Sequence, residues 1–283
     1  MADPHDDSIV KQRLVCVAYF SIVVSSTSLS PCLPHLIADH GLPGSSEGVP
    51  RMLGLSSLAH LSGKALLGWL ADRFGGLPML VFAMLINVSL LLLISFSSRM
   101  IVLQALWLME SFVFAGCWGA ASKFTHDNFT RSEWAAVLSH IAASSGLGSV
   151  TASYSFGTLL AVGSHWRVVF RASAFAQAIA LSYVIALIRT HDSFQKKQKH
   201  IGTEIAPNKQ QESLRRVLQR ISSDARFGLM FVAKISLMIV WQFSSLIPLF
   251  LSIRYSHMAA NTRAVILAMF PVSLIPSKVA LIL

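Results

Sequence analysis

Residues 63–76 read Gly63-Lys64-Ala65-Leu66-Leu67-Gly68-Trp69-Leu70-Ala71-Asp72-Arg73-Phe74-Gly75-Gly76. They end one apolar segment in a charged, glycine-rich turn, and a second apolar segment begins two residues later. The lysine lies about two turns inside the first segment, because one turn of α-helix contains 3.6 residues. The predicted function is built on this turn and this lysine.

The composition is that of a membrane protein. Of the 283 residues, 54% are hydrophobic and 13% are charged, and the mean hydropathy is +0.60. A soluble domain contains about 25% charged residues. The hydrophobic residues form separate runs of about 20 residues, each long enough to cross a hydrocarbon layer of ~30 Å. We therefore predict an all-α, polytopic membrane protein.

The apolar runs predict about eight membrane spans. Six precede a segment rich in Lys and Arg at residues 189–226, and they lie at residues 14–36, 52–71, 78–97, 101–122, 135–162 and 168–188. Two follow it, at residues 227–251 and from residue 264 onward. We expect a cytoplasmic tail at residues 1–13, a complete six-helix bundle at 14–188, a basic cytoplasmic loop at 189–226 and a truncated second bundle of two helices at 227–283.

The net charge of +10 is explained by the membrane rather than by a nucleic-acid partner. Basic residues collect on the cytoplasmic loops of membrane proteins. With the amino terminus inside, the interior segments hold about fourteen Lys and Arg residues and the exterior loops about six. This asymmetry predicts a cytoplasmic amino terminus. The three cysteines and ten histidines show no spacing typical of a metal site, so we predict neither a metal nor a cofactor.

Four motifs together resemble the major facilitator superfamily of secondary transporters. They are Gly68-x-x-x-Asp72-Arg73-x-Gly75, the Gly116-Cys117-Trp118-Gly119 run followed by Lys123 and Arg131-x-Glu133, the Trp166-Arg167-Val168-Val169-Phe170 run, and Pro248-Leu249-Phe250-Leu251. The resemblance covers essentially the whole chain. It implies a transporter rather than an enzyme, with two six-helix halves that each contain inverted three-helix repeats.

Within that superfamily, the chain is similar to the organophosphate:phosphate antiporters, which exchange glycerol 3-phosphate or sugar phosphates. Their second helix carries a lysine eight residues before the aspartate of the turn, as Lys64 stands before Asp72. Two arginines and a histidine of that branch correspond here to Ser26, Val240 and Ser145. The resemblance implies a small anionic organic solute, an organophosphate or a carboxylate, with phosphate or protons as the coupling ion.

Lys64 is the first candidate for binding this solute. It lies ~12 Å from the end of its helix, and His60 shares its face at helical spacing. A charge at membrane depth costs about 3 kcal/mol and normally faces a cavity or a partner. A structural ion pair or a packing lysine is the alternative.

Lys234 lies at a similar depth in the seventh span, and Trp241 lies further in. We predict that both contribute to the same solute site. The alternative for Lys234 is a side chain that extends to the membrane interface.

The turn is the candidate conformational gate, and the superfamily resemblance implies that it packs against the opposite half. Asp72 and Arg73 would form charge-assisted bonds there that break when the two halves rock. Gly68, Gly75 and Gly76 permit close packing and a tight turn.

Three alternative functions are consistent with these features. The first is secondary transport by alternating access. The second is a scaffold or receptor that uses a transporter-derived fold without transporting. The third is an inactive truncated product, because eight spans leave the second half without four helices.

Overall fold

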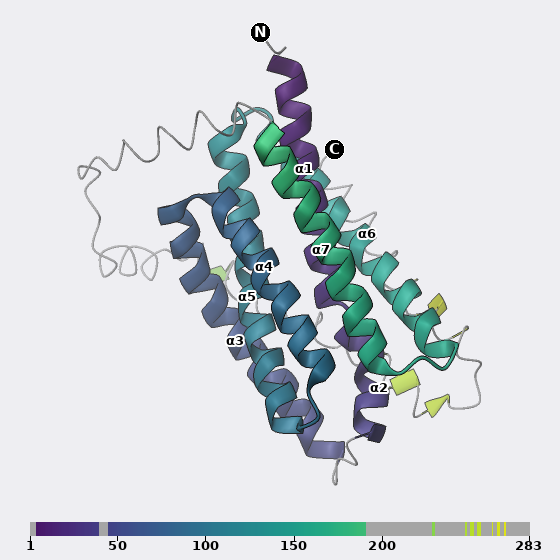
Figure 1. The fold of residues 1–283 in the computed structure, drawn as a ribbon. Coiled ribbons are helices and arrows are strands. Elements are labelled where there is room, and N and C mark those ends of the chain that lie inside the picture. Colours follow the sequence, from purple (N-terminus) through teal and green to yellow (C-terminus); the bar gives the residue numbers. More distant parts are fainter. Residues whose placement is uncertain are drawn as a thin grey trace. The chain divides into compact units, whose positions relative to one another are not determined.

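The structure is a computed structural model that describes residues 4–39 and 45–190, with isolated residues between 228 and 269. The chain divides into two compact units, Met1–Leu187 with Pro248–Leu283, and Ile188–Ile247. Within residues 4–39 and 45–190 every regular element is a helix (Figure 1). These helices are α1 (Pro4–Ser26), α2 (Leu29–Asp39), α3 (Ser45–Phe74), α4 (Gly76–Phe96), α5 (Met100–Asn128), α6 (Trp134–Ala161) and α7 (Trp166–Thr190).

The six predicted spans before residue 190 all lie on these helices, which confirms the all-α membrane fold. In the described part of the chain, five helical segments are long and apolar enough to cross a membrane: Asp7–Asp39, Gly76–Phe96, Met100–Asn128, Trp134–Ala161 and Trp166–Thr190. The predicted span at 52–71 lies on α3, which has 30 residues but is not among the five. Its mean hydropathy is lowered by glycines, serines, His60 and Lys64.

The first predicted span is not a single helix. A turn at Thr27 and Ser28 separates α1 from α2, and α1 already begins at Pro4, inside the segment predicted as a tail. Five hydroxyl groups beside the turn donate to carbonyl oxygens of their own segment, at 2.6–3.1 Å: those of Ser21, Ser25, Ser26, Thr27 and Ser28. Pro31 stands four residues after Thr27, has no N–H to donate to the Thr27 carbonyl oxygen, and crowds that oxygen with its ring, which explains the break. The local hydroxyl bonds offer the backbone groups alternative partners beside it.

The loop predicted after the fourth span begins later than expected. Lys123, His126 and Asp127 belong to α5, which continues to Asn128. Lys123 Nζ lies 2.8 Å from the Asp127 carboxylate, one helical turn away. Such a pair stabilises a helix by about 0.3–0.5 kcal/mol. The side chain of Asn128 also donates to the Phe124 carbonyl.

The helices pack as two parallel pairs with α4 and α7 beside them. In Figure 1, α3, α4 and α5 are neighbours, and α1 lies beside α6. A Cβ atom on Gly63 would lie 2.2 Å from the Phe112 carbonyl oxygen, so α3 and α5 meet backbone to backbone. In the other pair, a Cβ on Gly148 of α6 would lie 2.9 Å from the Phe20 carbonyl oxygen of α1. Each pair thus places a glycine against the carbonyl of a phenylalanine.

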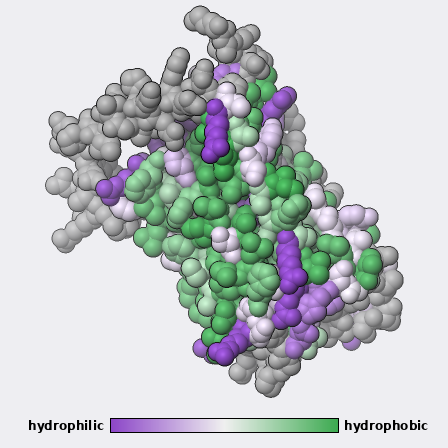
Figure 2. Space-filling model, in the orientation of Figure 1, coloured by the Kyte–Doolittle hydropathy of each residue, from purple (hydrophilic) through white to green (hydrophobic). Residues whose placement is uncertain are grey.

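This arrangement has the relation expected of inverted three-helix repeats. The first repeat consists of the α1–α2 segment, α3 and α4, and the second of α5, α6 and α7. The middle helix of each repeat packs on the first helix of the other. Hydrophobic residues cover the middle of the face in Figure 2, and hydrophilic residues lie mainly toward its ends, as expected of a bundle surrounded by lipid.

Candidate functional site

The turn that joins α3 to α4 depends on one glycine conformation. Gly75 has φ = 92°, a left-handed value that side chains disfavour. Gly76 begins α4 so close to α5 that a Cβ there would lie 2.3 Å from the Phe124 nitrogen. A Cβ on Gly68, by contrast, would meet no described atom within 4 Å. The turn is therefore anchored on α5, whereas Gly68 has room.

The two charged residues of the turn are exposed. The Arg73 guanidinium lies 5.8 Å from the centroids of the Trp69 and Phe74 rings. Exposed cation–π contacts of this kind contribute about 0.5–1 kcal/mol. Among residues 4–39 and 45–190, Asp72 has no ion pair. These weak local contacts leave the pair able to exchange them for contacts with another part of the protein.

Lys64 and His60 lie on one face of α3, as their spacing predicts. Lys64 is half-buried, and His60 is only 9% exposed. The His60 ring lies 5.8 Å from the ring of Phe114 on α5. The structure thus brings together two of the four predicted binding residues. The other two, Lys234 and Trp241, lie outside the described residues.

Glu110 is a buried carboxyl group that the motif search overlooked. It is 1% exposed, and its Oε1 atom has no hydrogen-bond partner among the described residues. It is the only residue with a charged side chain between Met100 and Ser122. A lone acid in the middle of an apolar run was the available signal, because ionisable residues inside membranes usually have a function.

Further buried polar groups connect α1, α4 and α7. Asn87 Nδ2 donates to Gln177 Oε1 at 3.1 Å, and Ser25 forms a hydrogen bond with the same amide oxygen. Three atoms of this group lack a partner among the described residues: Asn87 Oδ1, Gln177 Nε2 and Ser173 Oγ. The bonds join α7 to the two helices of the first repeat inside the apolar core.

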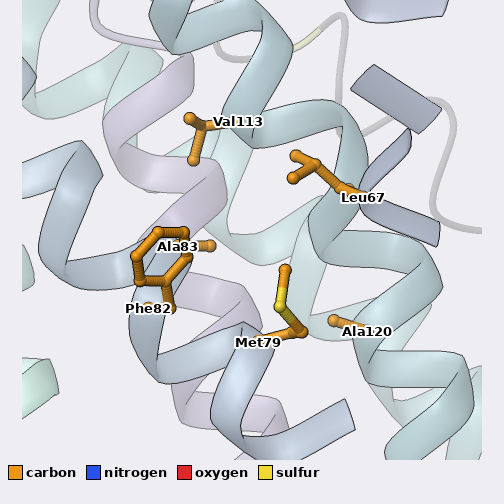
Figure 3. A pocket seen from close by; sticks show the side chains of 7 residues that line it. Leu67, Met79, Phe82, Ala83, Val113 and Ala120 are labelled. Atoms are coloured by element: carbon orange, nitrogen blue, oxygen red, sulfur yellow. The ribbon is translucent and has the colours of Figure 1, made fainter. Parts of the chain in front are cut away.

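A small pocket lies between α3, α4 and α5, and it is apolar. Figure 3 shows its side chains pointing toward one another from the three helices. The lining residues are Leu67, Met79, Phe82, Ala83, Val113, Gly116 and Ala120. Since neither Lys64 nor His60 lines it, the pocket does not form the predicted anion site.

The Trp166 motif ties together the ends of α2, α4 and α7. Trp166 Nε1 donates to the Asp39 carboxylate at 2.8 Å, and His165 Nε2 lies 3.1 Å from the same oxygen. The guanidinium of Arg167 donates to the Ser97 carbonyl oxygen at 3.2 Å. Trp166 itself is almost fully buried. The motif thus has a structural role at the end of the bundle opposite the Gly75 turn.

The connection between α5 and α6 is held by Glu133. Its carboxylate accepts hydrogen bonds from the Thr130 hydroxyl at 2.7 Å and the Thr130 backbone nitrogen at 2.9 Å. These bonds favour the charged form, so they lower the pKa of Glu133 from its ordinary value, with the hydroxyl as the largest cause.

The fold and the site define a polytopic helical membrane protein with a charged glycine turn between its second and third spans. The sequence matches the Major Facilitator Superfamily over residues 15–282. The chain belongs to this superfamily and is a membrane transporter of that class. No curated protein matched the chain.

Proposed function

We propose that the protein transports a small anionic organic solute, an organophosphate or a carboxylate, by alternating access. Lys64 carries the proposal, because it places a half-buried positive charge about 15 Å along α3 from Phe74. A charge at that depth costs about 3 kcal/mol unless it faces a cavity or a partner. His60 lies one turn away on the same face. The positive-inside rule supports a cytoplasmic amino terminus.

The Gly75 turn supports the alternating-access part of the proposal. Asp72 and Arg73 are exposed at the end of α3, and their position is fixed by the anchored turn. Exposed charges on a rigid support suit a contact that forms in one conformation and breaks in the other. In this proposal, the contact is with the carboxy-terminal part of the chain.

Uptake into proteoliposomes tests the solute class. The probes are inorganic phosphate, glycerol 3-phosphate and succinate, each supplied as a radiolabelled anion. Lys64→Ala should lower uptake about tenfold or more, because a bond to a charged group contributes about 1.5–3 kcal/mol. Lys123→Ala is the matched control, since Lys123 forms an exposed helical ion pair. If none of the anions moves, or Lys64→Ala transports normally, the anion site is wrong.

Cysteine labelling tests the gate. Asp72→Asn keeps the size of the side chain and removes its charge, so it should shift the balance between the two conformations. Single cysteines placed near the two ends of the bundle would then react at different rates from those of the parent protein. The Asp127→Asn variant should show the parent pattern, because Asp127 forms its pair within α5. Equal labelling rates in Asp72→Asn and the parent protein would show that Asp72 has no gating role.

A further inference from the structure

We propose that Glu110 binds and releases the proton that drives transport. The inference rests on the proposed function for its solute and extends it by naming the coupling ion and its site. The observations are the burial of Glu110 in the middle of a membrane helix and the lack of a hydrogen-bond partner for its Oε1 atom among the described residues.

The lack of a partner decides the charge state in this conformation. A carboxylate without a counter-ion in a low-dielectric interior is strongly disfavoured, and such a group takes up a proton instead. Among residues 4–39 and 45–190, no cation forms an ion pair with Glu110. The structure therefore corresponds to the protonated state. Within the described helices the Glu110 carboxyl makes no ion pair that would stabilise packing, which favours a role in proton binding.

The depth of Glu110 places it with the buried amides. Gly76 packs against Ala120, and α4 and α5 run antiparallel from that contact. Asn87 lies about 16 Å from Gly76 along α4, and Glu110 lies about 15 Å from Ala120 along α5. Both therefore lie at nearly the same level, where unpartnered polar atoms can receive or donate hydrogen bonds.

Lys64 lies at a different level. Gly63 packs on Phe112, and Gly116 packs on Leu67, between the parallel helices α3 and α5. Lys64 lies one residue after Gly63, whereas Glu110 lies two residues before Phe112, so the two groups are offset by about 5 Å along the bundle. A solute charge and a proton can therefore be held at neighbouring levels.

The other titratable side chains in this part of the bundle are few. Cys117 lies two turns further along α5 on the same face as Glu110. Those in the middle of the helices packed against α5 are Cys16 and Tyr19 on α1, His60 and Lys64 on α3, and His140 and Tyr154 on α6. The sequence of α4 contains no titratable side chain. Glu110 is thus the only carboxyl group in the middle of these helices, as far as residues 4–39 and 45–190 are concerned.

The step is a reversible proton transfer. When the site opens to one side, a hydronium ion gives its proton to the Glu110 carboxylate, forming the carboxylic acid and water. The neutral acid permits the conformational change, and the proton passes to water on the other side. Each solute anion then crosses together with one proton, which removes one negative charge from the transported pair.

Transport by Glu110→Gln tests the coupling, because glutamine resembles the protonated acid but cannot release a proton. The probes are the anions used above, with a pH gradient across the proteoliposome. We expect loss of gradient-driven accumulation while solute exchange at equal pH is retained. Glu133→Gln is the matched control, because Glu133 lies in the connection between α5 and α6. Gradient-driven accumulation by Glu110→Gln would overturn the proposal, even if anion transport itself is confirmed.

Infrared spectroscopy tests the proton without any solute. The purified protein in lipid at neutral pH should show the carbonyl stretch of a protonated carboxylic acid. This band should vanish in Glu110→Gln, persist in Glu133→Gln and shift in Glu110→Asp. A band that is absent from the parent, or unchanged in Glu110→Gln, would overturn the proposal. If no anion moves but the band behaves as expected, the solute class is wrong and the proton site stands.

Discussion

The inverted repeat relates two parallel helix pairs, α3 with α5 and α1 with α6. The two helices of the first pair approach each other more closely than those of the second. A Cβ on Gly63 would lie 2.2 Å from the Phe112 carbonyl oxygen and 2.9 Å from its carbonyl carbon. A Cβ on Gly148 would lie 2.9 Å from the Phe20 carbonyl oxygen and 3.3 Å from Val23 Cβ. The first contact involves the α5 backbone alone, and the second includes a side-chain atom of α1.

The difference shows where the bundle tolerates change. In both pairs the nearest atom is a backbone oxygen, so an added methyl group is accommodated only when a helix moves. The movement needed is a few tenths of an ångström at Gly148 and about an ångström at Gly63, because the Gly63 contact is much shorter. The α3–α5 pair also carries the Gly75 turn and both Lys64 and Glu110. The region on which the proposed function depends is thus the more tightly constrained of the two.

Gly63→Ala should have the largest effect. The added methyl group overlaps the α5 backbone, and overpacking costs about 1–3 kcal/mol or more. We expect a net loss of about 2 kcal/mol after the gain of about 1 kcal/mol in helix propensity. The loss of stability is measured by thermal unfolding in the presence of a thiol-reactive fluorophore. The buried thiols of Cys32 and Cys117 become reactive only when the protein unfolds.

Gly54→Ala is the control on the same helix. A Cβ there would meet no described atom within 4 Å. The unfolding temperature should stay the same or rise slightly, because only the propensity gain remains. Equal loss of stability in both variants would show that the α3–α5 contact is not the cause.

Gly148→Ala should have a smaller effect. The overlap with Phe20 is milder, so its cost of about 1 kcal/mol is nearly offset by the propensity gain. We expect an unfolding temperature within a few degrees of the parent, measured in the same assay. A loss as large as that of Gly63→Ala would mean that the two pairs are equally close, and the comparison would fail.

Thr130→Val should have the smallest effect on the unfolding temperature. Thr130 lies in the connection between α5 and α6, which joins the two helix pairs. The pKa of Glu133 is lowered in the folded state, so its contribution to stability is present above the ordinary value of 4.5. That contribution is lost as the pH falls through the folded-state pKa. Thr130→Val removes the hydroxyl bond, so it should lower the unfolding temperature slightly at neutral pH and not at acid pH. A difference independent of pH would point to packing of the Thr130 side chain instead.

Much of the fold was accessible from the sequence, because apolar runs of about 20 residues determine membrane spans. The break at Thr27 was not, since membrane helices often tolerate a proline such as Pro31 without ending. The extension of α5 beyond Ser122 depends on a side-chain pair that a hydropathy pattern does not include. The parallel pairing of α3 with α5 depends on tertiary packing. The sequence therefore did not predict that Gly63 lies against the α5 backbone.

The site was predicted less completely. Charge and spacing along α3 located Lys64, His60 and the Gly75 turn, and the structure places all three there. Motif comparison passed over Glu110, because a lone carboxyl group matches no pattern. Its significance depends on its burial and on the absence of a hydrogen-bond partner for its Oε1 atom among the described residues, neither of which a sequence shows.

The broken first helix has a consequence for biogenesis. When a helix is interrupted, backbone carbonyls at the interruption lose their regular partners, and lipid offers none. Here the Val23 and Ser25 carbonyl oxygens still accept bonds from the Thr27 and Ser28 backbone nitrogens, at 3.0 and 3.1 Å. The same oxygens also accept the hydroxyl bonds of Ser26, Thr27 and Ser28. The hydroxyl donors of the interruption are therefore satisfied within the segment itself when it leaves the insertion machinery, before α5 and α6 have been synthesised to cover it.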